Sequence, residues 1–200
     1  MPRTQGFAAF GRAEGLVSAM SRAFDREAEF ERLVLPHRSA LVQAIWRVLR
    51  DADLAEDALQ EALVILWRKL PALERHPNPR ALILRIGLDA ACDMLRARLR
   101  ERRRAAAQPG GEDGPSPVSP LERLERDAVA EEVLRAIGRL RSRQATAVLL
   151  RVVHELPYEE IARALGCSEA TVRVHVLRGR TKLKRWLSHL RSPLREEAPS

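Results

Sequence analysis

The sequence predicts an all-α protein made of two small helical units joined by a flexible linker. Along most of the 200 residues, apolar side chains recur three and four positions apart, which is the spacing of one helix face, and no stretch alternates as a strand does. Capping residues and prolines mark where several of these segments begin. With 46% hydrophobic and 31% charged residues, the chain has the composition of a globular protein with a core.

Composition divides the chain into five segments. Residues 1–24 are rich in small side chains, have little periodicity, and are expected to form a mobile extension. Helical units are expected at 25–104 and 120–191, and residues 192–200 form a tail. Residues 105–119 are rich in Pro and Gly, net acidic and almost free of large apolar side chains. This segment cannot bury itself and is expected to be the flexible linker.

The first unit begins with two predicted helices. The first has a long apolar face, bent at Pro36, formed by Phe30, Leu33, Val34, Leu41, Ile45, Val48 and Leu49. Asp53 is expected to cap the second, because Glu56 follows three residues later as in a capping box. The buried stripe of this second helix is expected to be Leu59, Leu63, Leu66 and Leu70.

The opposite face of the second helix carries Asp57, Gln60, Glu61 and Val64. Their spacing of i, i+3, i+4 and i+7 places them on one surface. On spacing alone, this surface is either a solvated acidic face or a docking site.

A third helix is expected to begin after Asn78 and Pro79. Its core candidates are Leu82, Ile83, Ile86, Ala90 and Leu95, and it ends in an arginine run, Arg96, Arg98, Arg100, Arg102, Arg103 and Arg104. Taken alone, the run is either a solvated helix end or a phosphate-binding surface.

The second unit contains a predicted helix-turn-helix between Leu156 and Trp186. Pro157 suits a first helical turn, Gly166 ends that helix, and Ser168 is a good N-cap for the next, with Glu169 against its dipole. Val172, Val176 and Leu183 are expected to face inward. The spacing, the tight turn and the charge together favour a DNA-binding helix over a surface helix with a solvated basic face.

The positive charge is concentrated in the C-terminal third of the chain. The net charge is +8, and residues 121–191 hold 15 Lys or Arg against nine Asp or Glu. From Ser168 to Arg191 there are seven basic residues and one acid. Arg173, near the helix start and on the side away from Val172 and Val176, is expected at base edges, whereas Arg178 is expected nearer the phosphates.

Several function classes find no support in the sequence. The two cysteines stand apart, and the five histidines have no metal-ligand spacing, so neither a disulfide framework, a metal site nor a cofactor is expected. With no glycine-rich phosphate loop or catalytic constellation, no catalytic residue is expected and no enzyme is implied. No apolar run approaches the length of a membrane span, so a cytoplasmic protein without membrane insertion is expected.

The order of these parts resembles the extracytoplasmic-function (ECF) sigma factors, the compact two-domain group of the sigma-70 family. The resemblance covers about residues 25–190. Asp53 to Glu61, continuing to Trp67, is similar to region 2.2. Asn78 to Ala81 with Arg85, Ile86 and Asp93 to Arg96 resembles regions 2.3 and 2.4, and the helix-turn-helix resembles region 4.

The resemblance implies partners and site residues. Asp57, Gln60 and Glu61, with Val64 on the same face, would bind the β′ clamp of core RNA polymerase. Promoter DNA would be bound at the minus-ten element by Arg80, Arg85, Arg96 and Arg100. At the minus-thirty-five element it would be bound by Ser168, Glu169, Thr171, Arg173, Val174, Arg178, Arg180 and Lys182. Region 4 would also touch the β flap, and an anti-sigma factor is an expected partner.

The chain departs from the family pattern in its minus-ten region. Leu82 and Leu84 stand where aromatic residues are common, and Asp89 replaces a common Asn. A leucine offers no π-face on which an unpaired base can stack. Region 2 is therefore expected to melt a restricted set of promoters, or to hold a flipped base with the loop between Leu70 and Arg80.

Three functions follow as hypotheses. The leading one is a sigma factor that binds core polymerase and directs promoter-specific initiation. The second is a sigma-like decoy that binds an anti-sigma factor but no DNA. The third is a dimeric helix-turn-helix regulator, which leaves the acidic face around Asp57 unexplained.

Overall fold

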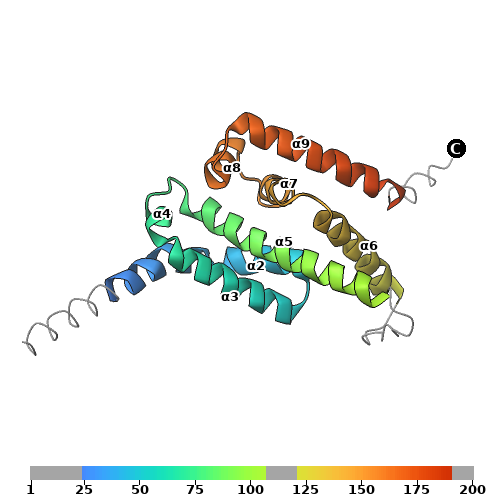
Figure 1. Cartoon of the computed structure of the whole chain (residues 1–200), viewed down its shortest axis with the longest axis horizontal. Helices are drawn as coiled ribbons and strands as arrows, with labels where there is room; N and C mark the ends of the chain where they lie inside the picture. Colours follow the sequence, from blue (N-terminus) through green and yellow to red (C-terminus); the bar gives the residue numbers. More distant parts are fainter. Residues whose placement is uncertain (1–23, 107–120, 191–200) are drawn as a thin grey trace, which may run out of the picture.

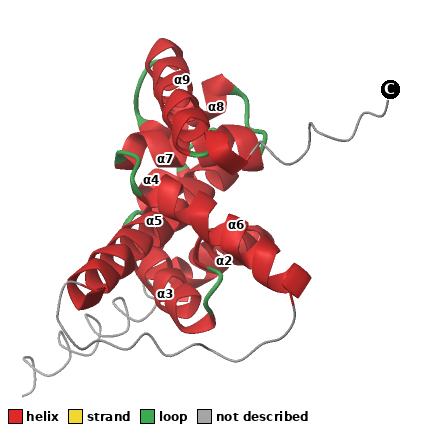
Figure 2. Cartoon of the chain, turned by 90° about the vertical axis from the view of Figure 1, so that its right-hand side faces the viewer, coloured by secondary structure: helices red, strands yellow, loops and turns green. Residues whose placement is uncertain are grey.

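The computed structural model of the chain describes residues 24–106 and 121–190. Across these two stretches every regular element is a helix, which confirms the all-α prediction (Figure 1, Figure 2). Most of the expected linker, the expected N-terminal extension except Phe24, and the tail lie outside the described residues. Below, the first unit means residues 24–106 and the second unit residues 121–190.

The first unit begins with a helix that is interrupted at Pro36. Residues 24–34 are helical, a 3-10 turn follows at Leu35–His37, and α2 spans Arg38–Leu49. Proline removes a backbone donor and clashes with the preceding turn, which explains the break that the sequence predicted. Helix α2 ends at Arg50, whose φ of 48° lies in the left-handed region.

Helix α3, Ala52–Arg68, is capped by Asp51 and not by Asp53. The Asp51 carboxylate accepts a hydrogen bond from the Leu54 N–H at 3.1 Å, and the extended backbone of Asp51 suits an N-cap. Asp53 lies in the first turn, where its charge complements the helix dipole. The expected apolar stripe also shifts: Leu66 and Leu70 are buried, but Leu59 and Leu63 are half-buried, and Ala58 and Ala62 are fully buried in their place.

A short helix, α4 at Leu70–Glu74, leads into the longest helix, α5 at Pro79–Ala106. Asn78 stabilises the start of α5, because its Oδ1 accepts from the Ala81 N–H at 3.0 Å. The helix continues two residues past Arg104, into the segment expected to be linker.

The second unit contains the predicted helix-turn-helix. Helix α6 spans Leu121–Gly138, and α7, Ser142–Val148, continues as a π-helical segment, Leu149–Val153. Helices α8, Tyr158–Leu165, and α9, Glu169–Trp186, form the motif itself. Gly166 ends α8 with a φ of 64°, which glycine adopts without strain, and the Ser168 Oγ accepts from the Thr171 N–H at 3.2 Å.

The two units pack against each other along α5. Helix α5 runs through the middle of the molecule, with α2 and α3 on one side and α6, α7 and α8 on the other, while α9 packs on α7 and α8 at the outer edge (Figure 1). One cluster of buried side chains extends from Val34 in the first unit to Val176 in the second. The units therefore share a continuous core in this arrangement.

Candidate functional site

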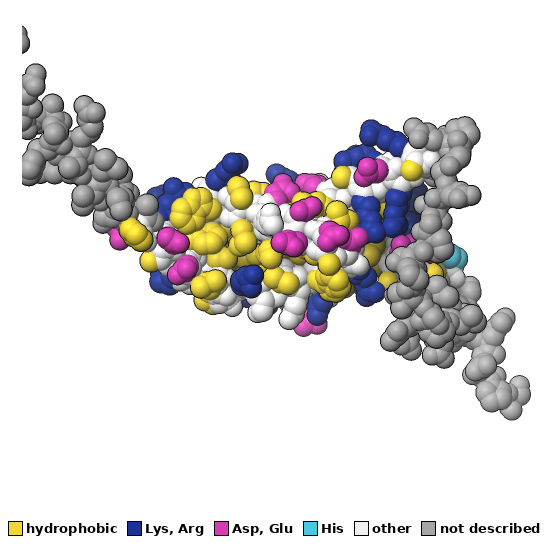
Figure 3. All heavy atoms as spheres, turned by 90° about the horizontal axis from the view of Figure 1, so that it is seen from below, with side chains coloured by type: hydrophobic (Ala, Val, Ile, Leu, Met, Phe, Trp, Pro, Cys, Tyr) yellow, Lys and Arg dark blue, Asp and Glu magenta, His cyan; other side chains and the backbone are white. Residues whose placement is uncertain are grey.

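The exposed face of α3 combines acidic and apolar side chains. Asp57, Gln60 and Glu61 are exposed, and Val64 retains 49% of its accessible surface. Figure 3, which views the molecule from the α3 side, shows acidic side chains gathered beside hydrophobic ones. Neither Asp57 nor Glu61 forms an ion pair with any basic side chain of the described residues. This face, Asp57, Gln60, Glu61 and Val64, is called the α3 face below.

An aromatic side chain extends the α3 face toward the helix C-terminus. Trp67 is 36% exposed, and its ring meets Phe30 edge-on with the centroids 5.3 Å apart. Arg26 lies 4.8 Å from the centre of the Trp67 ring and donates to the Trp67 carbonyl at 2.9 Å. Helix 24–34 therefore fixes the position of Trp67 beside Val64. In the sequence, Trp67 marked the end of the segment similar to region 2.2 but was not assigned to this face, although it lies one turn after Val64.

Helix α9 lies at the edge of the molecule (Figure 1), and its solvent-facing side carries basic side chains. Val172, Val176 and Gly179 are buried against the rest of the second unit, whereas Arg178 and Arg180 are exposed. Ser168 and Glu169 are exposed at the helix start, and Thr171 is half-buried. The expected DNA-binding side chains of α9 thus begin at a free helix N-terminus and continue along an open surface.

Two candidate side chains of α9 lie on its flanks. Arg173 contacts Glu169 at 3.3 Å and lies 4.3 Å from the centre of the Tyr158 ring, so it points toward α8 and not away from Val172 as expected. Its position follows from helix geometry, since it is only one residue on from the buried Val172. Lys182 donates to the Gln144 Oε1 at 3.2 Å and so lies against α7.

The four candidate arginines of α5 fall into two pairs. Arg80 and Arg100 are exposed. Arg85 contacts Asp89 at 2.9 Å, and Arg96 contacts Asp93 at 2.6 Å and also donates to the Leu140 carbonyl of the second unit at 3.4 Å. Within residues 24–106 and 121–190, Arg80 and Arg100 have no ion-pair partner, whereas the other two arginines are engaged in protein contacts.

Asp89 connects the two units. The Thr146 hydroxyl of α7, which is fully buried, donates to the Asp89 carboxylate at 2.6 Å, while Arg85 contacts the other carboxylate oxygen. A second bond joins Asn78 Nδ2 to the Glu160 carboxylate of α8, also at 2.6 Å. These contacts, together with Arg96 on Leu140, are called the inter-unit interface below.

The two leucines that replace aromatic residues belong to the core. Leu82 is 7% exposed and Leu84 is fully buried. Neither side chain can contact an unpaired base in this arrangement. The third departure, Asp89, has a structural role that the sequence did not reveal, because its hydrogen-bond donor lies 57 residues further along the chain.

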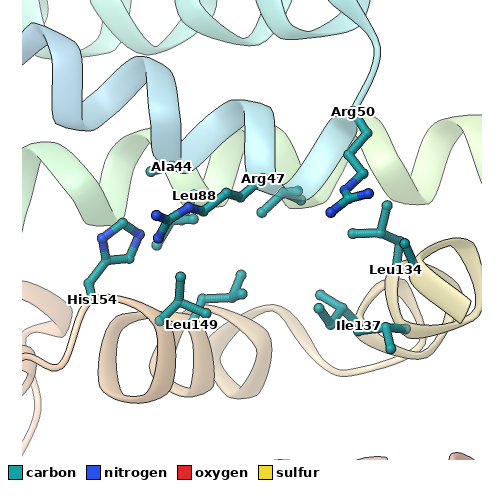
Figure 4. A pocket seen from close by; sticks show the side chains of 12 residues that line it. Ala44, Arg47, Arg50, Leu88, Leu134, Ile137, Leu149 and His154 are labelled. Carbon is teal, nitrogen blue, oxygen red and sulfur yellow. The ribbon is translucent and has the colours of Figure 1, made fainter. Parts of the chain in front are cut away.

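A groove of about 430 Å³ lies between α2, α5 and α6 and the π-helical segment. Its walls are mainly apolar, and Arg47, Arg50 and His154 line its rim (Figure 4). Figure 4 shows His154 and Arg47 near one another, with Leu134 and Ile137 at the other end of the groove. The His154 Nε2 is buried and has no hydrogen-bond partner among the residues that the structure describes.

Acidification is expected to destabilise this fold through three histidines whose pKa values are lowered. Burial, helped by Arg47 and Arg80, lowers the pKa of His154 below its usual value of 6.5, and burial lowers the pKa of His37 and His175 as well. The unfolded chain then binds more protons than the folded one, so the free energy of unfolding falls as the pH drops below 6.5. Urea unfolding between pH 5 and 8 measures this free energy. His154→Gln should make its dependence on pH less steep. An equally steep curve for that variant would contradict the assignment to His154.

Replacing Thr146 by valine should weaken the inter-unit interface. The change keeps the side-chain shape but removes the donor to the Asp89 carboxylate, and a hydrogen bond to a charged group contributes about 1.5–3 kcal/mol. We expect the free energy of unfolding in urea to fall by that amount. Thr181→Val, at an exposed position of α9, is the matched control. Equal stability of the two variants would show that the Thr146 bond contributes nothing.

Comparison with known proteins agrees with this geometry. A family model described as sigma-70 region 2 matches residues 33–101, and one described as sigma-70, region 4 matches residues 130–183. The RNA polymerase sigma-H factor of Pseudomonas aeruginosa is 30% identical over 170 residues, which are 80% of this chain and 87% of that protein. The chain belongs to the sigma-70 family.

Other sigma factors show the same likeness. The ECF RNA polymerase sigma factor SigM of Mycobacterium tuberculosis is 29% identical over 186 residues, 90% of this chain and 87% of that protein. Among solved structures, the sigma factor RpoE of Bartonella quintana, in complex with the anti-sigma factor NepR, is 24% identical. The match covers 80% of this chain and 96% of that chain, with a TM-score of 0.49. In the described part of this sigma factor, no helix could cross a membrane.

Proposed function

We propose that this sigma factor binds core RNA polymerase through the α3 face and directs it to promoters with α5 and α9. The α3 face carries the proposal: two exposed carboxylates, which have no ion-pair partner in the described part of the chain, lie beside Val64 and Trp67. Unpaired surface charge next to exposed apolar side chains suits a basic and partly apolar partner. The proposed partner site is the clamp of the β′ subunit, with a further contact between the second unit and the β flap.

The basic surface of α9 is the proposed minus-thirty-five contact. Ser168 and Glu169 at its N-terminus are exposed, and so are Arg178 and Arg180. A helix that enters the major groove between the two phosphate backbones requires this exposure. The proposed contact residues are Ser168, Glu169, Thr171, Arg173, Val174, Arg178, Arg180 and Lys182. Arg80 and Arg100 of α5 are the first candidates for the minus-ten contact. Arg85 and Arg96 are further candidates, and Arg96 loses its contact with the Leu140 carbonyl when the inter-unit interface separates.

Promoter contact by both units requires them to separate. The minus-ten and minus-thirty-five elements are about 25 base pairs apart, or about 85 Å at 3.4 Å per base pair. In the described arrangement α5 contacts α7, and α7 contacts α9. Because a single helical layer separates α5 from α9, the two helices are too close together to contact both promoter elements at once. We therefore infer that the arrangement described is a closed state, and that the inter-unit interface opens on the promoter.

A decoy function is the second candidate, and the inter-unit interface favours it. In the closed state Leu82 and Leu84 are buried, and Asp89 is bonded to Thr146. A chain that stayed closed would present its surfaces to an anti-sigma factor without contacting DNA at both elements. For the leading function, an anti-sigma factor is a proposed regulator and the cytoplasm the proposed location.

Footprinting of a promoter separates these functions. Core polymerase with this sigma factor should protect both elements from hydroxyl-radical cleavage. Arg178→Ala combined with Arg180→Ala should weaken protection at the minus-thirty-five element and leave polymerase binding intact. A footprint identical to that of core polymerase alone would support the decoy and contradict the leading function.

A further inference from the structure

The outward face of α9 is apolar at its centre. At 3.6 residues per turn, the side chains opposite the buried Val172, Val176 and Gly179 are Ala170, Val174, Leu177 and Thr181. All four are exposed. Leu177, at 67%, is the most exposed large hydrophobic side chain of the described residues, and Val174 is 41% exposed. The residues Ala170, Val174 and Leu177 are called the α9 stripe below.

Basic side chains border the α9 stripe without covering it. Arg173 is held on one flank by Glu169 and the Tyr158 ring. Arg178 and Arg185 are exposed on the other side, and Arg180 lies on the same flank as Arg173. A helix in the major groove has phosphates on both sides and base edges in front. The arrangement therefore directs the charges of α9 to the phosphates and its apolar side chains to the bases.

Thymine is the base that offers an apolar partner there. Its C5-methyl group projects into the major groove, whereas the other base-edge groups are hydrogen-bond donors or acceptors. Val174 and Leu177 are three residues apart, about 4.5 Å along the helix axis, which is close to the 3.4 Å step between base pairs. Two neighbouring base pairs are thus within reach of the two side chains.

We propose that Val174 and Leu177 contact the methyl groups of thymines at two neighbouring base pairs of the minus-thirty-five element, and so determine its sequence. This rests on the proposed function, because it assumes that α9 enters the groove there. It also changes the role of Arg173. Held on the flank, Arg173 contacts the edge of the element or its phosphates, and the central preference comes from the α9 stripe.

The test begins with core polymerase, the full chain and promoters randomised at the minus-thirty-five element. Selection for binding should enrich A·T pairs at two neighbouring positions. Those thymines are then replaced by deoxyuridine, which lacks only the methyl group. The affinity of the wild-type holoenzyme should fall about three- to fivefold for each methyl group removed, the value of one buried methyl group.

Variants assign the effect to the α9 stripe. Each of the variants Leu177→Ala and Val174→Ala should lose part of the difference in affinity between the thymine and deoxyuridine promoters. Val152→Ala, which changes another exposed valine of the second unit, should retain the whole difference. Arg178→Ala should weaken binding to both promoters equally, because phosphate contacts do not depend on sequence.

The possible failures are distinguishable. Selection of a preferred sequence whose binding is unaffected by deoxyuridine would overturn the thymine contacts and leave the proposed function standing. The thymine contacts would also be overturned if Leu177→Ala retained the difference in affinity between the thymine and deoxyuridine promoters. If Leu177→Ala reduced polymerase binding and left the base preference unchanged, the α9 stripe would be a protein-docking surface. Enrichment of no sequence at all would overturn the inference and the proposed function together.

Discussion

Reversing the charge of the α3 face, with Asp57→Arg and Glu61→Arg, should abolish binding to core RNA polymerase. Both side chains are exposed and unpaired, so the substitutions place two positive charges at the centre of the proposed interface. Like charges across an interface cost several kcal/mol, which corresponds to a loss of about a hundredfold or more in affinity. Arginine has a helix propensity at least as high as that of the residues it replaces, so α3 should remain folded.

Co-purification with core polymerase measures this effect, and a circular dichroism spectrum reports on the fold. The matched control is Asp93→Arg with Glu101→Arg, which makes the same change of charge at two exposed positions of α5. Only the α3 variant should fail to co-purify. Undiminished binding by a folded α3 variant would remove the main functional assignment of the first unit.

A leucine at Gly179 should disrupt the packing of α9 on α7. A Cβ atom built at Gly179 would lie 2.6 Å from Val148 Cγ2 and 3.4 Å from the backbone oxygen of Gln144. The Val148 methyl group is too close for a Cβ atom and must move, and the remaining atoms of a leucine need further space between α9 and α7. Overpacking of this kind costs about 1–3 kcal/mol. We expect that loss in stability, together with loss of sequence-specific DNA binding, while the α3 face still binds polymerase.

Urea unfolding and promoter binding measure the two effects of Gly179→Leu. Ala170→Leu is the control for stability, because it adds the same side chain at an exposed position of the same helix. Its free energy of unfolding should stay close to that of the wild type. If Gly179→Leu proved as stable as Ala170→Leu, α9 would not be as closely packed on α7 as described.

Local chemistry explains what the sequence predicted correctly. The turn at Gly166, the cap at Ser168 and the inward valines of α9 all act within a few residues, so their pattern determines the helix-turn-helix. The α3 face was predicted for the same reason, because one helical period separates Asp57 from Glu61. The error at the start of α3 was also local: Asp51 and Asp53 are both suitable caps, and the backbone conformation selects Asp51.

Contacts between distant residues explain what the sequence did not reveal. In the sequence, Asp89 was only a departure from the family pattern, because its donor, Thr146, belongs to another helical unit. The flank position of Arg173 depends on the Tyr158 ring, and the exposure of Leu177 depends on which side of α9 meets α7 and α8. The spacing of Leu177 from Val174 was visible in the sequence and could have indicated an apolar stripe outside the buried face.

Transcription by core RNA polymerase on a promoter library tests the central claim most directly. With the full chain added, start sites should concentrate at specific promoters, and the variant with Asp57→Arg and Glu61→Arg should leave the polymerase without that selectivity. Start sites that are the same with and without the chain would contradict the account.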